Sequence, residues 1–157
     1  MDAETGTLPS FSIVDPDFDT YSEENPQDIR KGESFAAEVI NRVMHGKGWP
    51  RTLLIWVYDE HGGYHDHVPP PAAVPPDEVE GRSPVIVSPY ARPDYVCSDV
   101  LDHTSVLKLL ELKWKLPALT ARDAAAASPL GALDLTGPPA FLDPPALPEP
   151  SLTWGSW

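Results

Sequence analysis

The feature that most constrains the fold is the run Thr52–Tyr58, in which apolar residues follow one another with almost no alternation. A strand with apolar side chains on both faces belongs in the middle of a sheet that is covered on both sides, typically a parallel sheet. Before this run, apolar residues recur at helical spacing from Phe35 to Met44, with Ser34 as the expected N-cap and Gly46 as the expected stop. The order of helix and strand predicts an α/β layered fold.

Two further elements are expected after this strand. Residues 84–88 are mostly apolar and are followed by Pro89, which indicates a second buried strand. Residues 105–114 have the apolar spacing of a helix, and Thr104 or Ser105 would cap it. Both elements fit the same layered fold.

Proline marks the C-terminal part of the chain. Thr120–Asp123 resembles a capping box, with Asp in place of Glu, ahead of an alanine run that ends at Ala127. From Ser128 onward prolines recur and no periodicity survives, which predicts a wrapping or disordered tail. We therefore expect one domain over residues 1–127 and an irregular Pro-rich tail over residues 128–157.

An excess of negative charge limits the partners of the chain. Its 157 residues include 24 acidic and 11 basic side chains, which give a formal net charge of -13. Binding to nucleic-acid phosphates or to an anionic membrane surface needs clustered Lys and Arg. The composition therefore argues against nucleic acid as a partner. It suits a protein that concentrates cations, although a charged surface also simply keeps a protein in solution.

The sequence as given shows neither a signal peptide nor a segment suited to stable membrane insertion. The longest apolar stretch, Leu53–Val57, is far too short to cross a bilayer, and the N-terminal residues lack the apolar run of a signal peptide. The chain as written is therefore expected in the cytoplasm, and export would need a signal elsewhere. Cys97 is the single cysteine, so no disulfide can form within the chain.

A dense group of titratable residues follows the first strand and reads DEHGGYHDH at residues 59–67. Ligands of α/β sheets lie beyond the carboxyl ends of the strands, which is where Asp59 and Glu60 are expected. Gly62 and Gly63 let the chain leave strand geometry, so that the two carboxylates can share one ion. A solvated turn would explain a lone acidic pair, but burying this many titratable groups without a metal is costly. The pattern therefore favours a divalent-metal site.

The histidines of this loop allow more than one role. His61, His65 and His67 could bind a metal directly, because imidazoles favour zinc and its neighbours. Alternatively, Asp66 could fix the tautomer of His67 without touching the metal, or the rings could hydrogen-bond the loop backbone. Direct ligation and loop bracing both stay open at this point.

A second candidate site lies at Asp102-His103-Thr104, where the later helix is expected to begin. The N-terminus of a helix attracts anions such as phosphate. Capping alone explains Asp102 and Thr104, but it leaves His103 unexplained. Arg92 follows the second strand and could also reach a phosphate, although a single arginine there is more often a surface residue.

Four segments carry a resemblance to a known family. They are WPRTLLIWVYDEHGGYHDHVPP at residues 49–70, PVIVSPYAR at 84–92, DHTSVLK at 102–108 and GESF at 32–35. These segments resemble the signature of the phosphoesterase family, which contains bacterial phospholipases C, plant non-specific phospholipases C and acid phosphatases. The resemblance covers roughly residues 10–127, and motifs of this length are highly specific.

The resemblance implies a fold and a chemistry. The fold would be an alkaline-phosphatase-like three-layer α/β/α sandwich, and the reaction would be hydrolysis of a phosphate ester or a phospholipid with a divalent metal ion as cofactor. By resemblance, Asp59 and Glu60 correspond to paired acidic metal ligands. The residues that would line or brace the site, or take part in catalysis, are His61, Asp66, His67 and His103. Full-length relatives are commonly exported.

The chain also departs from the family pattern. Members are usually several times longer, and the Glu-Asn-Arg-Ser-Phe-Asp type motif of their N-terminal half and its Thr or Ser nucleophile are not present in this sequence. Asn25 stands where many members have His, and His65 stands where they usually have Tyr or Phe. We therefore expect the C-terminal portion of a phosphoesterase, weak or inactive unless it pairs with a separate N-terminal fragment. The alternative is a non-catalytic acidic remnant that binds metal or a partner.

Overall fold

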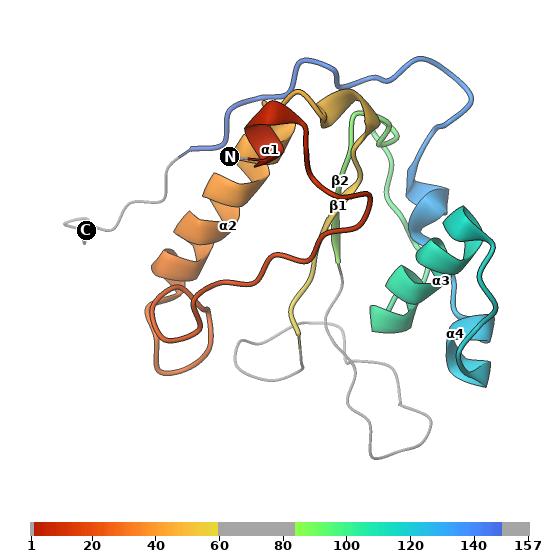
Figure 1. Ribbon diagram of the computed structural model, residues 1–157, viewed down its shortest axis with the longest axis horizontal. Helices are drawn as coiled ribbons and strands as arrows, with labels where there is room; N and C mark the ends of the chain where they lie inside the picture. The colour runs from red at the N-terminus through yellow and green to blue at the C-terminus, as the bar shows by residue number, and fades with distance from the viewer. Residues whose placement is uncertain (1, 60–83, 149–157) are drawn as a thin grey trace. The chain divides into compact units, whose positions relative to one another are not determined.

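Two compact units make up the chain in the computed structural model, which describes residues 2–59 and 84–148 (Figure 1). The first unit, Met1–Thr52 with Phe141–Trp157, holds α1 (Asp2–Thr5), α2 (Ile29–Met44) and the 3-10 turn η1 (Trp49–Arg51). The second unit, Leu53–Ala140, holds β1 (Leu54–Trp56), β2 (Val85–Val87), α3 (His103–Trp114), α4 (Ala121–Ala125) and the 3-10 turn η2 (Pro129–Ala132). This mixture of helices and strands agrees with the expected α/β class. No helix in these described parts of the chain is both long and apolar enough to cross a membrane.

The first unit is organised by α2, which ends at Met44 as expected but begins earlier than expected. Asp28 caps the helix, because its carboxylate accepts a hydrogen bond from the backbone N–H of Arg30. Ser34 therefore lies inside the helix, and its prediction as the N-cap was wrong. The apolar spacing marks only the part of α2 that follows Phe35, since the first turns are polar and carry no such pattern.

Gly32 allows a close approach of backbone to the first turn of α2. A Cβ atom at this position would lie 2.2 Å from Glu23 Cγ and 3.1 Å from the carbonyl carbon of Ser22. Ser22 is buried at this contact. The glycine of the GESF segment is thus required by packing, because any larger residue would push residues 22–23 away from the helix.

Residues 141–147 are fastened to the first unit by side chains that bond to their backbone. Trp49 is 3% exposed, and its Nε1 donates to the carbonyl oxygen of Phe141 at 2.8 Å. The Asn41 amide accepts from the N–H of Leu147 at 2.8 Å and donates to its carbonyl oxygen at 3.3 Å. A proline-rich segment without periodicity is held in this way by hydrogen bonds rather than by a secondary structure of its own.

The sheet of the second unit is an antiparallel pair, β1 with β2, among the residues that the structure describes. Ile55 lies opposite Ile86 in this pair. All three residues of β1 are only partly buried, and Val85 at the start of β2 is 48% exposed. The positions of both strands were predicted, but a parallel strand buried on both faces is not what this pair shows. A two-stranded sheet leaves much of its surface uncovered.

In the second unit, α3 packs against α4 and η2 (Figure 1). α3 ends at Trp114 as expected, and its N-cap is Asp102, so the expected caps Thr104 and Ser105 lie inside its first turn. α4 begins at the capping box predicted from Thr120 and Asp123, which is confirmed. Both helix starts therefore depend on side chains that satisfy backbone N–H groups.

The segment after Ser128 packs on the second unit. Ala91 and Leu133 form an isolated antiparallel bridge, and the N–H of Asp134 donates to the carbonyl oxygen of Tyr90 at 2.8 Å. Leu133 is 6% exposed and belongs to the small core. This part of the chain wraps on the unit through backbone hydrogen bonds.

Candidate functional site

Asp59 is the one residue of the 59–67 loop that the structure describes. It lies in a bend three residues beyond β1 and is exposed. The other predicted residues of this loop lie outside the described residues: Glu60, His61, His65, Asp66 and His67. Among the described side chains, no group of three or more His, Cys, Asp or Glu residues is arranged to hold a metal ion. The metal site therefore stays a prediction.

His103 of the second candidate site contacts the backbone next to Asp59 of the first candidate site. It is the first residue of α3, and its Nε2 lies 2.7 Å from the carbonyl oxygen of Tyr58. Tyr58 directly precedes Asp59 in the chain. Two segments that are 45 positions apart in sequence therefore meet just beyond the end of β1.

The contact with Tyr58 also defines the tautomer of His103. A carbonyl oxygen can only accept a hydrogen bond, so Nε2 must carry the hydrogen atom. In the neutral ring, Nδ1 then holds the lone pair and can accept a hydrogen bond or a proton. The backbone at the end of the strand thus orients the ring.

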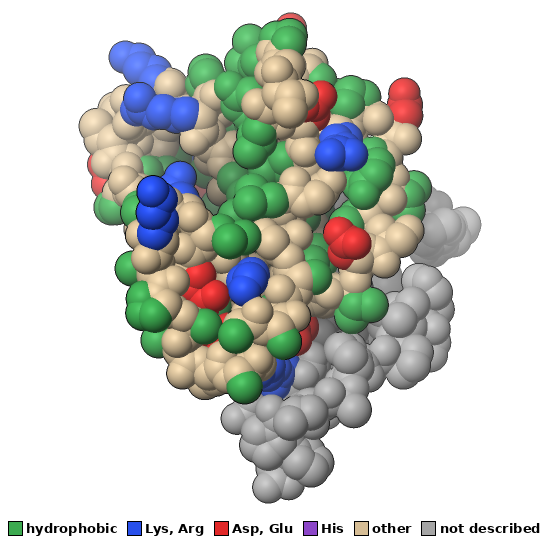
Figure 2. Space-filling model, turned by 90° about the vertical axis from the view of Figure 1, so that its right-hand side faces the viewer, with side chains coloured by type: hydrophobic (Ala, Val, Ile, Leu, Met, Phe, Trp, Pro, Cys, Tyr) green, Lys and Arg blue, Asp and Glu red, His purple; other side chains and the backbone are tan. Residues whose placement is uncertain are grey.

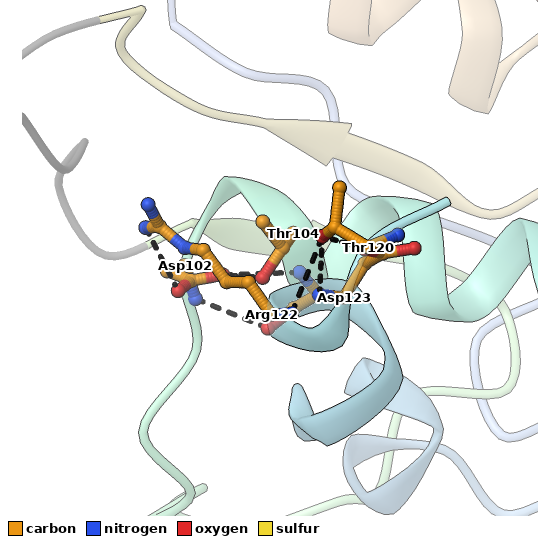
Figure 3. Close-up of polar contacts among 6 residues, drawn as sticks. Asp102, Thr104, Thr120, Arg122 and Asp123 are labelled. Carbon is orange, nitrogen blue, oxygen red and sulfur yellow. Dashed lines mark hydrogen bonds and ion pairs between the residues drawn. The ribbon is translucent and has the colours of Figure 1, made fainter. Parts of the chain in front are cut away.

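Asp102 fixes the start of α3 (Figure 3). Its Oδ1 accepts hydrogen bonds from Thr104 Oγ1 at 2.6 Å and from the N–H of Ser105 at 3.2 Å. In return, the N–H of Asp102 donates to Ser105 Oγ at 3.1 Å, which completes a reciprocal capping box. Capping therefore accounts for Asp102 and Thr104, and it leaves His103 as the residue whose role lies outside the helix.

Arg122 reaches the same carboxylate from α4 (Figure 3). Its Nη2 lies 3.4 Å from Asp102 Oδ2, and the side chains of Arg122 and Asp102 are 21% and 19% exposed. Burial raises the pKa of Asp102, but hydrogen bonds from Thr104 and Arg122, together with the charge of Arg122, outweigh it and hold that pKa below its usual value. Asp102 is therefore a charged carboxylate shared between two helices.

A buried pair of carboxyl groups joins α3 to α4. Asp123 is 1% exposed, and its carboxylate accepts from the N–H groups of Leu119 and Thr120, both at 2.7 Å, and from Thr120 Oγ1. Glu111 of α3 is 8% exposed. A hydrogen bond with Asp123, burial and the charge of Asp123 raise the pKa of Glu111, whereas hydrogen bonds from Thr120 and Glu111 lower the pKa of Asp123. The neighbouring Asp123 carboxyl group and burial thus favour the protonated form of Glu111.

Arg92 contributes to the fold of the second unit. Its Nε donates to the carbonyl oxygen of Leu133 at 3.1 Å, and its guanidinium lies over the ring of Tyr95, 5.2 Å from the centroid. These contacts explain why an arginine stands here without any need for a phosphate ligand.

Sequence reasoning did not anticipate Arg122 or Glu111. The Thr120–Asp123 box located the start of α4, and hence the first-turn position of Arg122. Nothing in the spacing indicates that this side chain reaches a residue 20 positions earlier. Glu111 lies on α3 between lysines, where a sequence pattern suggests a solvated charge. Only tertiary packing shows that both side chains face inward.

Comparison with known proteins identifies the family. The sequence model of the Phosphoesterase family matches residues 1–117. Phospholipase C B of Mycobacterium tuberculosis is 31% identical over 166 aligned positions, which cover 88% of this chain and 32% of that protein. Non-specific phospholipase C6 of Arabidopsis thaliana is 30% identical over 159 positions, which cover 81% of this chain and 31% of that protein. Non-hemolytic phospholipase C of Burkholderia pseudomallei is 29% identical over 143 positions, which cover 73% of this chain and 20% of that protein.

The matched region includes Asp59 and His103, two of the candidate residues that the structure describes. The chain spans a third or less of the length of these relatives. The match extends over most of this chain and confirms the resemblance seen in its motifs. The chain belongs to the phosphoesterase family.

Proposed function

We propose that this chain supplies part of a divalent-metal site for the hydrolysis of phosphate esters. In the proposal, Asp59 and Glu60 are the metal ligands, and His103 lies beside them as a proton-carrying residue. The observation that carries it is the 2.7 Å contact between His103 Nε2 and the carbonyl oxygen of Tyr58, which brings the helix start next to Asp59. An alkaline-phosphatase-like α/β/α sandwich would be the frame of the complete site.

The donor chemistry of the chain suits such an ion. Asp59 is exposed at the end of a strand, and carboxylate oxygens are the ligands that hard divalent cations prefer. A bound cation would supply positive charge to the phosphoryl oxygens. His103 would accept a proton at Nδ1, because Nε2 is already donating to Tyr58. His61, Asp66 and His67 would line or brace the same site.

The names of the relatives suggest the substrate class. They are phospholipases C, so a phospholipid phosphodiester is a candidate substrate beside simpler phosphate esters. The family's Thr or Ser nucleophile has no counterpart in this sequence. We therefore propose weak or no turnover by these 157 residues alone, and full activity only together with the N-terminal part of the family fold.

A metal titration tests the assignment of the ligands. Calorimetry with Mg²⁺, Ca²⁺, Mn²⁺ and Zn²⁺ should detect binding to the wild-type chain, and the Asp59→Asn/Glu60→Gln variant should bind at least about tenfold more weakly. Asp94→Asn is the matched control, since Asp94 is an exposed aspartate elsewhere in the second unit. Equal binding by the Asp59/Glu60 variant and the wild type would sink the assignment.

An activity assay tests the rest of the proposal. Phosphate release from p-nitrophenyl phosphate, and release of nitrophenol from its phosphorylcholine ester, should be weak for the chain alone with any of the four ions. Robust turnover would overturn the proposal that the nucleophile must come from elsewhere.

A non-catalytic partner-binding role is the second candidate, and exposed apolar side chains favour it. On the second unit, Val96 is 83% exposed, Leu119 77% and Leu112 51%. Figure 2 shows hydrophobic side chains interspersed with Lys and Arg on one face. Single exposed apolar residues are normal, but this many large ones suit a surface that another protein covers. Sedimentation of the chain with and without an added N-terminal phosphoesterase fragment would separate this role from self-association.

A further inference from the structure

We infer that Arg122 is a positioning residue for His103, acting through Asp102 so that the Nδ1 atom of His103 is available beside Asp59. The catalytic meaning of this inference rests on the proposed function. The geometric part of the inference is independent of the proposed function, because each contact that it uses lies among described residues of the second unit. Three links lead from α4 to the end of β1.

The first link is the hydrogen bond between His103 and Tyr58. His103 is partly buried, and the 2.7 Å contact of its Nε2 with the Tyr58 carbonyl oxygen selects the tautomer with hydrogen on Nε2. Since His103 is the first residue of α3, the ring keeps this contact only while the first turn of the helix stays in place. A shift of the turn by about 1 Å would break a hydrogen bond of this geometry.

The second link is that the two carboxylate oxygens of Asp102 bind different partners. Oδ1 accepts from Thr104 and Ser105, and both of these contacts are internal to the first turn of α3. Oδ2 lies 3.4 Å from Arg122 Nη2, and this contact leaves the helix. The cap therefore shapes the turn, whereas Arg122 holds the turn in position (Figure 3).

The third link is the fixed place of Arg122 itself. Its backbone N–H donates to Thr120 Oγ1 at 3.2 Å within the capping box of α4. α4 packs against α3, and Lys108 Nζ of α3 donates to the carbonyl oxygen of Ala124 at 2.7 Å. Arg122 is thus presented from a short helix that cannot shift freely against α3.

The test measures the tautomer of His103 by NMR in the full chain with ¹⁵N-labelled histidine. His103→Gln assigns the signal among the five histidines. A hydrogen bond of ordinary net strength changes an equilibrium by roughly fivefold to tenfold, so the wild type should favour hydrogen on Nε2 by that ratio. Arg122→Met should lower the ratio at least about threefold, and Arg122→Lys, which keeps the charge, should restore most of it.

Two further variants separate positioning from folding. Asp102→Asn keeps a good N-cap but removes the charge that Arg122 pairs with, so it should lower the ratio as Arg122→Met does. Arg51→Met removes an arginine of the first unit and should leave the ratio unchanged. Circular dichroism checks that each variant is folded. If Arg122→Met does not fold, the tautomer ratio of Asp102→Asn tests the positioning role instead.

The outcomes distinguish this inference from the proposed function. An unchanged tautomer ratio in folded Asp102→Asn and Arg122→Met proteins overturns the positioning role, whatever the metal titration shows. A lowered ratio with rescue by Arg122→Lys supports it. Loss of metal binding in the Asp59/Glu60 variant bears on the proposed function alone, because the positioning of His103 is measured by its tautomer ratio and not by metal binding.

Discussion

The two long helices of this chain begin with the same chemistry but differ in what the cap reaches. Each has an aspartate N-cap whose carboxylate also pairs with an arginine. At α2, Asp28 pairs with Arg30, two positions later, with Nε 2.9 Å from Oδ1 and side chains that are 37% and 25% exposed. At α3, Asp102 pairs with Arg122, 20 positions later, and these side chains are 19% and 21% exposed.

This comparison separates a local cap from a cap with a tertiary role. The Asp28 pair closes within one turn of one helix, so it can fix only where α2 starts. The Asp102 pair joins α3 to α4, and through His103 it also bears on the end of β1. A helix cap becomes a positioning device when its second carboxylate oxygen bonds outside the helix.

The largest expected effect comes from Asp102→Ala. This change removes a capping oxygen and leaves Arg122 without its carboxylate, so we expect the free energy of unfolding to fall by about 2 kcal/mol. Urea denaturation measures this loss in the free energy of unfolding. Amide hydrogen exchange should show faster opening in both α3 and α4, because the lost pair spans them.

Asp28→Ala is the matched control for that change. It should speed amide exchange in the first turn of α2 and leave α3 and α4 as in the wild type. If Asp28→Ala destabilises the chain as much as Asp102→Ala does, or if α4 keeps its protection in Asp102→Ala, the contrast between the two caps is wrong.

A smaller effect is expected from Glu111→Gln, and it depends on pH. The pKa of Glu111 is raised above its ordinary value of 4.5, by its hydrogen bond with Asp123 first and by burial second. A raised pKa means that the folded state favours the proton, so this stabilisation is complete below pH 4.5 and is lost as pH rises through the raised pKa. Gln cannot ionise and can still donate to Asp123, so the urea midpoint of the variant should fall less than that of the wild type as pH rises above 4.5.

Glu38→Gln is the control for this pH dependence. Glu38 forms an exposed pair with Arg42 one turn later on α2, which is a geometry that contributes little to stability. Its profile above pH 4.5 should follow that of the wild type. A Glu111→Gln profile that also follows the wild type would mean that the pKa of Glu111 is not raised in the folded chain.

The sequence predicted those elements whose signals are local. The α4 capping box and the C-terminal ends of α2 and α3 were predicted, because cap residues and apolar spacing act within a few positions. The start of α2 was missed because Ser34 and Asp28 are both capping residues, and the polar first turns contain no apolar spacing to choose between them. The location of the strands followed from apolar runs, but their antiparallel pairing depends on a partner about 30 positions away.

In the candidate site, too, the residue with a local signal was predicted and the residue with only a tertiary contact was missed. His103 was singled out because capping explained its neighbours and not the histidine itself, and its contact with Tyr58 agrees with that argument. Arg122 was missed because its importance lies in a contact between two helices, and no sequence period reports such a contact. Local patterns therefore single out candidate residues such as His103, whereas the residues that contact them from other helices emerge only from packing.

Asp28→Asn gives the smallest expected effect, and it appears only in acid. A hydrogen bond from Arg30 is the main cause that lowers the pKa of Asp28 from 3.8 to about 2. A lowered pKa stabilises the folded state above pH 3.8, and this contribution is lost as pH falls toward 2. Asn caps a helix about as well but does not titrate, so the Arg30 N–H signal should change less between pH 4 and pH 2 in the variant.

The same experiment at high salt sharpens the contrast with Asp102. Salt screens an exposed pair, so added NaCl should reduce the acid-induced change at Arg30 in the wild type. It should have less effect on the signals of Thr104 and His103, because the Asp102–Arg122 pair is about four-fifths buried. Equal salt sensitivity at the two helix starts would show that burial does not distinguish them, and the long-range pair would then be as weak as the local one.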